Sequence, residues 1–354
     1  MNSMNIIEQS KLNFYTQIKK GKILTVDELF TEVSAEDLDL REFLTSWYQS
    51  LVSFHFLPLD DETLEEIIIH SPDTIVGLHH KQQKQYDCDL TTNELQRLYE
   101  YLCLKNNVDW NYKKPFVSFY TQIQQVAVRV SLTHYSCSPH NISKCFIRVL
   151  NSKPLAMQDF QLEGLDKKIQ TIIKEKKNLL ICGSTGSGKT TFLNALLQFM
   201  PKDEHLVILE DIDEIHAPHP YTTKLLADEK KSEKSLNSLM KNALRMSPKR
   251  MLIGEIRSKE VETFLLAMNT GHQGLMGTVH ANSAKDAIER LALLFKIYSS
   301  KDLSYELVLK LVCSNLDYVI FLNDKKVSEI INVYGSENHS ILYEALYSSA
   351  RESF

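Results

Sequence analysis

The segment Gly183-Ser-Thr-Gly-Ser-Gly-Lys-Thr190 constrains the fold of this chain more than any other feature. It has the spacing G-x-x-x-x-G-K-[ST]. An apolar strand-like segment, 178–182, precedes it, and a helical pattern with Leu193, Leu196 and Leu197 follows. A strand, a glycine-rich loop and a helix in this order form a phosphate-binding loop, because backbone amides and the positive end of the helix then face an anion. The sequence therefore predicts a nucleotide site on an α/β sheet.

The positions of this loop have separate expected roles. We expect Lys189 to reach the β and γ phosphates of ATP, and the Thr190 hydroxyl to bind Mg²⁺. The other residues expected to surround the phosphates are Gly183, Ser184, Thr185, Gly186, Ser187, Gly188 and Thr191. The alternative is an ordinary turn rich in glycine and serine. The order of strand, loop and helix favours the nucleotide interpretation.

Acidic residues end two further strand-like segments, 206–211 and 251–256. The first contains Glu210 and Asp211 and is followed by Asp213 and Glu214, and the second contains Glu255. The carboxyl ends of parallel strands share one edge of a sheet, so these acids can converge on the phosphate loop.

Hydrolysis needs such carboxylates to orient water and to hold a metal ion. We expect Glu214 to orient the attacking water, and Glu255 to hold Mg²⁺, partly through water. The alternatives are a solvated turn acid at Glu214 or Asp213, and a structural ion pair between Glu255 and Arg257.

Two histidines, His272 and His280, flank a strand-like segment at 275–280. A lone histidine at a strand end is usually a core residue with its hydrogen bonds made. Because His280 follows the carboxyl end, we expect it to sense the γ-phosphate.

The first part of the chain reads as helices and short strands. Thr25 and Glu28 have the spacing of a capping box, Thr91 and Glu94 are expected to begin a further helix, and 65–70 with 74–78 indicates a hairpin. Further on, the apolar period becomes two, which puts Arg129 and Arg148 off the apolar faces of their strands. We expect a helix after Ser34. The expected domains are a helical extension at 1–55, an α+β domain at 56–150, a linker at 151–154 and an ATPase domain at 155–354.

Composition narrows the class of protein. The six cysteines form no CxxC pair, so neither a disulfide framework nor a zinc site is indicated. A net charge of -5 argues against a protein that coats nucleic acid. No apolar run is long enough to span a bilayer, and the start lacks a signal peptide pattern, so we expect a cytoplasmic protein that meets the inner membrane through partners.

Several segments together resemble the secretion-superfamily ATPases. They are the phosphate loop, ILEDIDEI at 208–215, LMKNALRMSPKRMLIGEIRSKE at 239–260, AMNTGHQG at 267–274 and GTVHANSAKDAIERL at 277–291. Within that superfamily the chain is most similar to the Tad pilus motors and the conjugative type IV secretion ATPases. LEEIIIHSPDTI at 64–75, AVRV at 127–130 and FIRVL at 146–150 resemble the family's N-terminal domain.

The resemblance implies a fold, partners and residue roles. The fold is a RecA-like P-loop NTPase domain at the C-terminus with a smaller α+β domain before it. The subunit works in a hexameric ring that uses ATP and Mg²⁺ to drive an inner-membrane platform of a pilus or secretion system. The implied site residues are Glu210 to Glu214 as the Asp box, Glu255 as the Walker B acid, His272 and His280 as the His box, and Arg129 and Arg148 as phosphate-contacting arginines.

Several departures from the family pattern bear on these roles and on the branch of the family. Ser258 stands where an acid usually follows Arg257, and Val126-Ala127-Val128 replaces a polar lead-in before Arg129. The four-cysteine metal insertion of type II secretion motors is absent, and the chain is shorter than many Tad motors. The alternatives to a secretion or pilus motor are a RecA-like DNA or RNA motor and a scaffold protein without hydrolysis.

Overall fold

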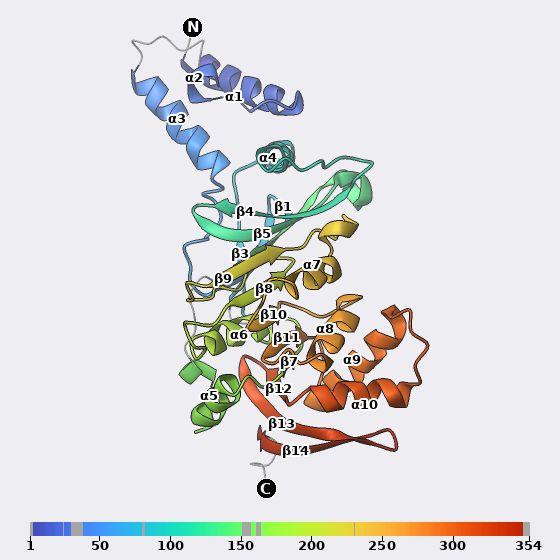
Figure 1. The fold of residues 1–354 in the computed structure, drawn as a ribbon. Coiled ribbons are helices and arrows are strands. Elements are labelled where there is room, and N and C mark those ends of the chain that lie inside the picture. Colours follow the sequence, from blue (N-terminus) through green and yellow to red (C-terminus); the bar gives the residue numbers. More distant parts are fainter. Residues whose placement is uncertain are drawn as a thin grey trace. The chain divides into compact units, whose positions relative to one another are not determined.

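The computed structural model describes residues 3–23, 25–29, 38–79, 82–150, 157–160, 164–229 and 231–349. The chain divides into two compact units, 1–152 and 153–354 (Figure 1). The expected linker at 151–154 and Ser34, which is expected to precede a helix, lie outside the described residues.

Unit 1 contains one antiparallel sheet and several helices. Its helices are α1 (Ser3–Lys19), α2 (Val26–Leu29), α3 (Leu38–Val52) and α4 (Thr92–Lys105), with 3₁₀ turns at Tyr135–Cys137 and Pro139–Asn141. Its strands are β1 (Leu64–Ser71), β2 (Thr74–His79), β3 (Gln82–Tyr86), β4 (Phe116–Ile123), β5 (Val126–Thr133) and β6 (Lys144–Val149). The strand order is β3-β2-β1-β6-β5-β4. The predicted hairpin is β1 and β2, and the predicted capping box between Thr25 and Glu28 is present. Thr91 and Glu94 begin α4 as predicted, and the structure shows that they form a capping box as well.

One apolar core holds unit 1 together. In β5 the alternation buries Val128, Val130 and Leu132, as predicted. The N-terminal helices pack on the same core: the ring centroid of Phe14 on α1 lies 5.4 Å from that of Tyr48 on α3. The sheet therefore has one buried face and one partly exposed face, as is usual for antiparallel sheets.

Unit 2 is built on an eight-stranded sheet whose order is β14-β13-β12-β7-β11-β10-β8-β9. Its strands are β7 (Leu179–Gly183), β8 (Leu206–Glu210), β9 (Thr222–Leu226), β10 (Arg250–Ile253), β11 (Leu275–Val279), β12 (Tyr318–Asn323), β13 (Lys326–Glu337) and β14 (Ser340–Ser348). Its helices are α5 (Asp166–Lys174), α6 (Lys189–Leu197), α7 (Leu236–Ala243), α8 (Glu260–Asn269), α9 (Ala284–Tyr298) and α10 (Tyr305–Asn315), with 3₁₀ turns at Met157–Phe160 and Ser232–Lys234. Neighbouring strands in the series β12-β7-β11-β10-β8-β9 are parallel. The pairs β12–β13 and β13–β14 are antiparallel.

Helices cover both faces of this sheet. In β7, Leu180 and Cys182 face a core shared with α7, α8, α9 and α10, whereas Leu179 and Ile181 face a core shared with α5 and α6. Burial on both faces explains why the parallel strands read as continuous apolar runs. The predicted class is confirmed: unit 2 has the α/β architecture of a RecA-like P-loop domain, and the smaller unit 1 is α+β.

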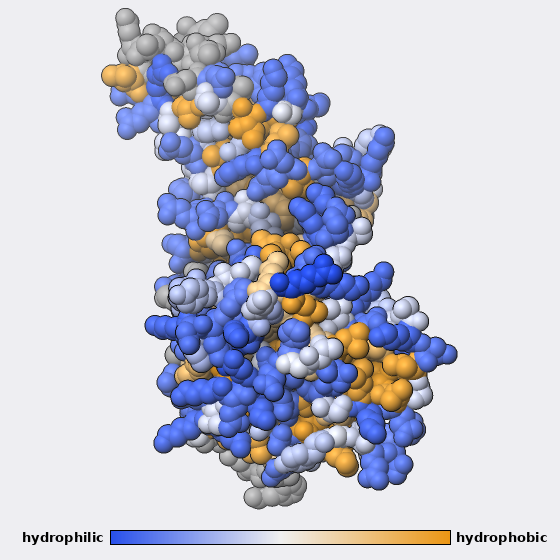
Figure 2. Space-filling model, in the orientation of Figure 1, coloured by the Kyte–Doolittle hydropathy of each residue, from blue (hydrophilic) through white to orange (hydrophobic). Residues whose placement is uncertain are grey.

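Two features of unit 2 differ from the sequence prediction or extend it. Strand β10 ends at Ile253, earlier than the predicted 256. Some large apolar side chains stay exposed, among them Leu293 and Ile297 on α9 and Leu307 on α10. Figure 2 shows apolar atoms at the surface in the region of these two helices. Among the described residues, no helix has both the length and the apolar character that crossing a membrane requires.

Candidate active site

The carboxyl edge of the parallel sheet brings most of the predicted residues of unit 2 together. Strand β7 pairs with β11, β11 with β10, and β10 with β8. The ends of these four strands lead into the phosphate loop, His280, Glu255 and the acidic segment that starts at Glu210. The topology therefore places them side by side along one crevice, where open parallel sheets bind ligands.

The phosphate loop has a backbone that needs glycine. Gly186 and Gly188 have φ angles of +76° and +89°, in the left-handed region. A Cβ on Gly183 would lie 2.4 Å from the carbonyl oxygen of Leu322 and 2.4 Å from the Ser187 hydroxyl. That hydroxyl is buried and makes no hydrogen bond within the described part of the chain. The tight curl and the buried donor suit a loop that wraps around an oxyanion.

Lys189 places a cation inside the loop. It is the first residue of α6 and is 8% exposed. Its ammonium donates hydrogen bonds to the carbonyl oxygens of Gly183 at 3.0 Å and Ser184 at 2.8 Å. An ammonium group at the positive end of a helix, beside curled backbone amides, fits the phosphates of a nucleotide.

His280 lies between Lys189 and Glu255. Its Nδ1 is 3.4 Å from the Lys189 ammonium, and its Nε2 is 3.2 Å from Oε1 of Glu255. Burial lowers the pKa of His280, the charge of Lys189 lowers it further, and the charge of Glu255 acts in the opposite direction. A neutral ring fits both contacts, because Nδ1 can then accept from Lys189 while Nε2–H donates to Glu255.

Two further acids near Glu255 have partners of their own. Arg257, the possible partner of Glu255 in the sequence, instead contacts Asp211 at 2.6 Å between Nη2 and Oδ2. Glu260, which is 1% exposed, accepts hydrogen bonds from the backbone amide and the hydroxyl of Ser258, each at 2.7 Å. Ser258 therefore serves to fix a buried acid, and Glu255 keeps His280 as its neighbour.

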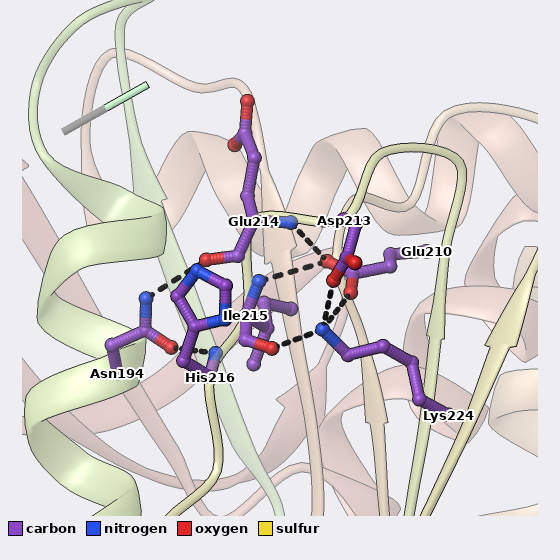
Figure 3. A network of polar contacts seen from close by, with 7 residues as sticks. All are labelled: Asn194, Glu210, Asp213, Glu214, Ile215, His216 and Lys224. Carbon is purple, nitrogen blue, oxygen red and sulfur yellow. Dashed lines mark hydrogen bonds and ion pairs between the residues drawn. The ribbon is translucent and has the colours of Figure 1, made fainter. Parts of the chain in front are cut away.

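Glu210 forms the centre of a polar network (Figure 3). It is 2% exposed, and one carboxylate oxygen accepts hydrogen bonds from the amides of Glu214 at 3.2 Å and Ile215 at 3.1 Å. Lys224 on β9 forms an ion pair with Glu210 at 2.9 Å, and it also contacts Asp213 and the carbonyl oxygen of Ile215. Burial raises the pKa of Glu210, and Lys224 and the two amides counteract part of this effect.

The backbone of Glu214 is fixed, whereas its carboxylate is not. Asn194 on α6 donates to the Glu214 carbonyl oxygen at 3.1 Å and accepts from the His216 amide at 2.9 Å. Figure 3 shows the Glu214 side chain extending away from this network. Among the described residues its carboxylate has no hydrogen-bond or ion-pair partner, so it is available to a ligand.

His272 is not brought to this edge. It precedes the amino end of β11, whereas His280 follows the carboxyl end. The five residues of β11 correspond to about 16 Å of strand between the two edges of the sheet. His272 instead lines a cavity of about 200 Å³ together with Lys176, Lys249 and Arg250. The expectation that it contacts the nucleotide is therefore corrected for the site within unit 2.

Arg129 and Arg148 belong to unit 1, where they are direct cross-strand neighbours on β5 and β6. Arg129 donates from Nε to the Ser118 hydroxyl at 3.1 Å. Within the described ranges, neither guanidinium has a carboxylate within 4.0 Å. Glu66 on β1 is the cross-strand neighbour of Arg148 on its other side, but within the described ranges it forms no ion pair with Arg148. Two like charges opposite each other destabilise a sheet, so the arginine pair is suited to an anionic ligand.

The protein atoms alone do not form a closed metal site. The described residues contain no group of three or more histidine, cysteine or acidic side chains that could hold a metal ion. Thr190 and Glu255 nevertheless offer a hydroxyl and a carboxylate oxygen, the hard ligands that Mg²⁺ prefers. Such a pair fits Mg²⁺ that takes its remaining ligands from phosphates and water.

Sequence reasoning missed the positions that support the acids. Asn194 is the one polar residue between Phe192 and Leu197, and Lys224 is the one charge in β9. A single polar residue in an otherwise buried helix was the signal that could have identified Asn194, since such a side chain needs hydrogen-bond partners.

Comparison with known proteins identifies the family. The family described as Type II/IV secretion system protein matches residues 96–329, about two thirds of the chain. The chain belongs to this family. The match includes all of the carboxyl edge and the strands that carry Arg129 and Arg148.

Curated relatives agree with this assignment. An uncharacterized protein of Methanocaldococcus jannaschii is 27% identical over 304 residues, 76% of this chain and 42% of that protein. The conjugal transfer protein TrbB of Rhizobium radiobacter is 32% identical over 50% of this chain and 54% of its own length. The type IV secretion system protein VirB11 of Bartonella henselae is 36% identical over 41% of this chain and 42% of its own length. The chain thus spans about half the length of these relatives.

Solved structures share the fold. The ATPase DotB of Legionella pneumophila has a TM-score of 0.58 at 16% identity, over 85% of this chain and 79% of that chain. The pilus retraction motor PilT with bound ADP has a TM-score of 0.57 at 19% identity, over 86% of this chain and 84% of that chain. At these identities the likeness establishes the fold alone.

Proposed function

We propose that this chain hydrolyses ATP to ADP and phosphate and uses the energy for mechanical work in a secretion or pilus-assembly system. The observation that carries this proposal is that His280 contacts both Lys189 and Glu255, at the edge where Glu214 presents a carboxylate without a partner among the described residues. A cation in a phosphate loop beside two acids at neighbouring strand ends is suited to cutting a phosphoanhydride bond.

Each residue has a distinct role in the proposed reaction. The loop amides and Lys189 bind and orient the β and γ phosphates, and Lys189 stabilises the negative charge that develops on them. Glu214 orients the attacking water and accepts its hydrogen bond. His280, as a neutral ring that contacts both Lys189 and Glu255, reports on the presence of the γ-phosphate. Bound Mg²⁺, held by Thr190 and through water by Glu255, would neutralise phosphate charge.

Arg148 and Arg129 are proposed as additional anion contacts in the catalytic cycle. Their cross-strand position concentrates two positive charges on one face of the unit 1 sheet. An arginine that stabilises the transition-state oxygens can raise the rate by about a thousandfold or more. Arg148 is the stronger candidate, because the Arg129 guanidinium already donates to Ser118.

The biological role is proposed at two levels. Family membership supports a motor that acts on inner-membrane components of a secretion or pilus system, from the cytoplasmic side, as a hexameric ring. The exposed apolar side chains of α9 and α10 are compatible with such assembly. Tad pilus assembly is the first specific role proposed. The similarity to TrbB and VirB11 favours conjugative or type IV secretion as the second.

A phosphate-release assay on the purified chain tests the proposal and separates it from a nucleic-acid motor. We expect release that depends on Mg²⁺ and ATP and is unchanged by single-stranded DNA. Strong stimulation by DNA would replace the secretion role with a DNA motor. No release, with nucleotide still bound, would indicate a scaffold protein.

A further inference from the structure

We propose that Lys224 on β9 and Asn194 on α6 are positioning residues that hold the backbone segment carrying Glu214. This inference rests on the proposed function, because Glu214 is the residue through which both would act. Neither side chain touches the Glu214 carboxylate; both act on the backbone that carries it.

The first support comes from the edge of the sheet. Lys224 on β9 binds Glu210 at the end of β8, and Glu210 accepts the amides of Glu214 and Ile215. Lys224 also reaches Asp213 and the Ile215 carbonyl oxygen directly. The segment from 211 to 215 is therefore tied at several points to one ammonium group (Figure 3).

The second support comes from the phosphate loop. Asn194 belongs to α6, the helix that begins at Lys189. Its amide group bonds the Glu214 carbonyl oxygen and the His216 amide, one on each side of Ile215. A rigid helix thus links the acidic segment to the residue that binds phosphate. Helix α6 and these two hydrogen bonds therefore hold the Glu214 backbone at a set distance from Lys189.

The free energy needed to bury the Glu210–Lys224 pair favours a role in positioning over a role in stability. Taking a carboxylate such as Glu210 out of water is unfavourable, and an apolar core of the same volume is often as stable as a buried ion pair. What the network provides is a defined conformation for a segment without regular secondary structure, from Asp211 to Pro220. A catalytic group needs such definition, because a displacement of about 1 Å can reduce a rate about a hundredfold.

The test compares Lys224→Met with Lys224→Arg in steady-state ATPase assays. We expect Lys224→Met to lower kcat by about 10-fold to 100-fold, with the KM for ATP and the nucleotide Kd within about threefold of wild type. Lys224→Arg, which keeps the charge and can reach the same oxygens, should recover most of the rate. Lys168→Met, at an exposed lysine on α5, is the matched control and should match wild type.

A double-mutant cycle with Glu214→Gln identifies the route of the effect. If Lys224 acts through Glu214, then Lys224→Met lowers kcat by less than about twofold in the Glu214→Gln background, since interacting residues are not additive. A full additional loss in that background would overturn the inference, as would wild-type kcat in Lys224→Met itself. Thermal melting of each variant separates loss of fold from loss of position.

Asn194→Ala repeats the cycle without touching an ion pair, and it serves as the test if Lys224→Met does not fold. The same pattern is expected: a lower kcat, unchanged binding and no additivity with Glu214→Gln. A wild-type enzyme that releases no phosphate would refute the proposed function itself. An active wild type whose Glu214→Gln variant keeps full turnover would refute only the route through Glu214.

Discussion

Replacing Glu214 and Glu210 by glutamine should affect stability differently, because only Glu210 has partners within the described residues. The two acids lie four residues apart in one segment, but their surroundings differ. The Glu214 carboxylate has no partner among the described residues, whereas Glu210 is 2% exposed and binds Lys224 and two amides. We expect Glu214→Gln to change the free energy of unfolding by about 0.5 kcal/mol or less and to lower kcat by about 10²–10⁴-fold. That loss corresponds to about 3–5 kcal/mol in the activation barrier.

Glu210→Gln should lower both stability and turnover, because Glu210 pairs with Lys224 and accepts the backbone amide of Glu214. Its effect on kcat should be about that of Lys224→Met, a loss of about 10-fold to 100-fold. A hydrogen bond to a charged group contributes about 1.5–3 kcal/mol, and glutamine keeps an acceptor oxygen while losing the charge that faces Lys224. We therefore expect a loss of about 2 kcal/mol, which lowers the melting temperature of a unit of this size by roughly 4–8 °C. Calorimetry and phosphate release on both variants provide the measurement. Full turnover in Glu214→Gln, with turnover lost but stability kept in Glu210→Gln, would show that the catalytic acid is Glu210.

Three further predictions concern other parts of the site. Because the pKa of His280 is lowered, the contribution of this residue to folding stability is present above pH 6.5 and is lost as the pH falls through the lowered value. The acid limb of the pH profile of kcat/KM should therefore lie below pH 6.5 and be absent in His280→Gln. Arg148→Ala should lower kcat by about 100-fold or more and Arg129→Ala by less, with nucleotide titrations unchanged; wild-type turnover in both would remove unit 1 from catalysis. Gly183→Ala should lose about 1–3 kcal/mol of stability in urea melts, because its Cβ would lie 2.4 Å from a backbone oxygen; an unchanged midpoint would show that the loop relaxes freely.

The parts of the fold that sequence predicted best are those with strong local patterns. The phosphate loop needs glycines at fixed positions, and the structure uses Gly186 and Gly188 in left-handed conformations. The apolar strands around it bury both faces, which their composition already indicated. The alternation at Arg129 and Arg148 predicted which face they occupy, and the structure adds that they are cross-strand neighbours.

What sequence could not predict depends on register and on distant partners. Glu210 and Lys224 form a diagonal ion pair between β8 and β9, whose register places Lys224 opposite Ile208, and neither segment alone indicates this contact. The partner of Arg257 is Asp211, 46 positions away, so a search for nearby acids points to Glu255 instead. The two histidines flank one strand as predicted, and the parallel sheet places them at its opposite edges, so that His280 follows the carboxyl end and His272 does not. In each case contacts between distant parts of the chain decide between alternative partners that the local sequence does not distinguish.

The most direct test of ATP hydrolysis at this loop is phosphate release by purified Lys189→Ala beside wild type and Lys168→Ala. Lys189 donates to the loop carbonyl oxygens and contacts His280, whereas Lys168 is an exposed lysine on α5. The proposed site predicts that Lys189→Ala lowers turnover by at least about 100-fold while Lys168→Ala matches wild type. Wild-type turnover in a folded Lys189→Ala protein would contradict the assignment of the active site.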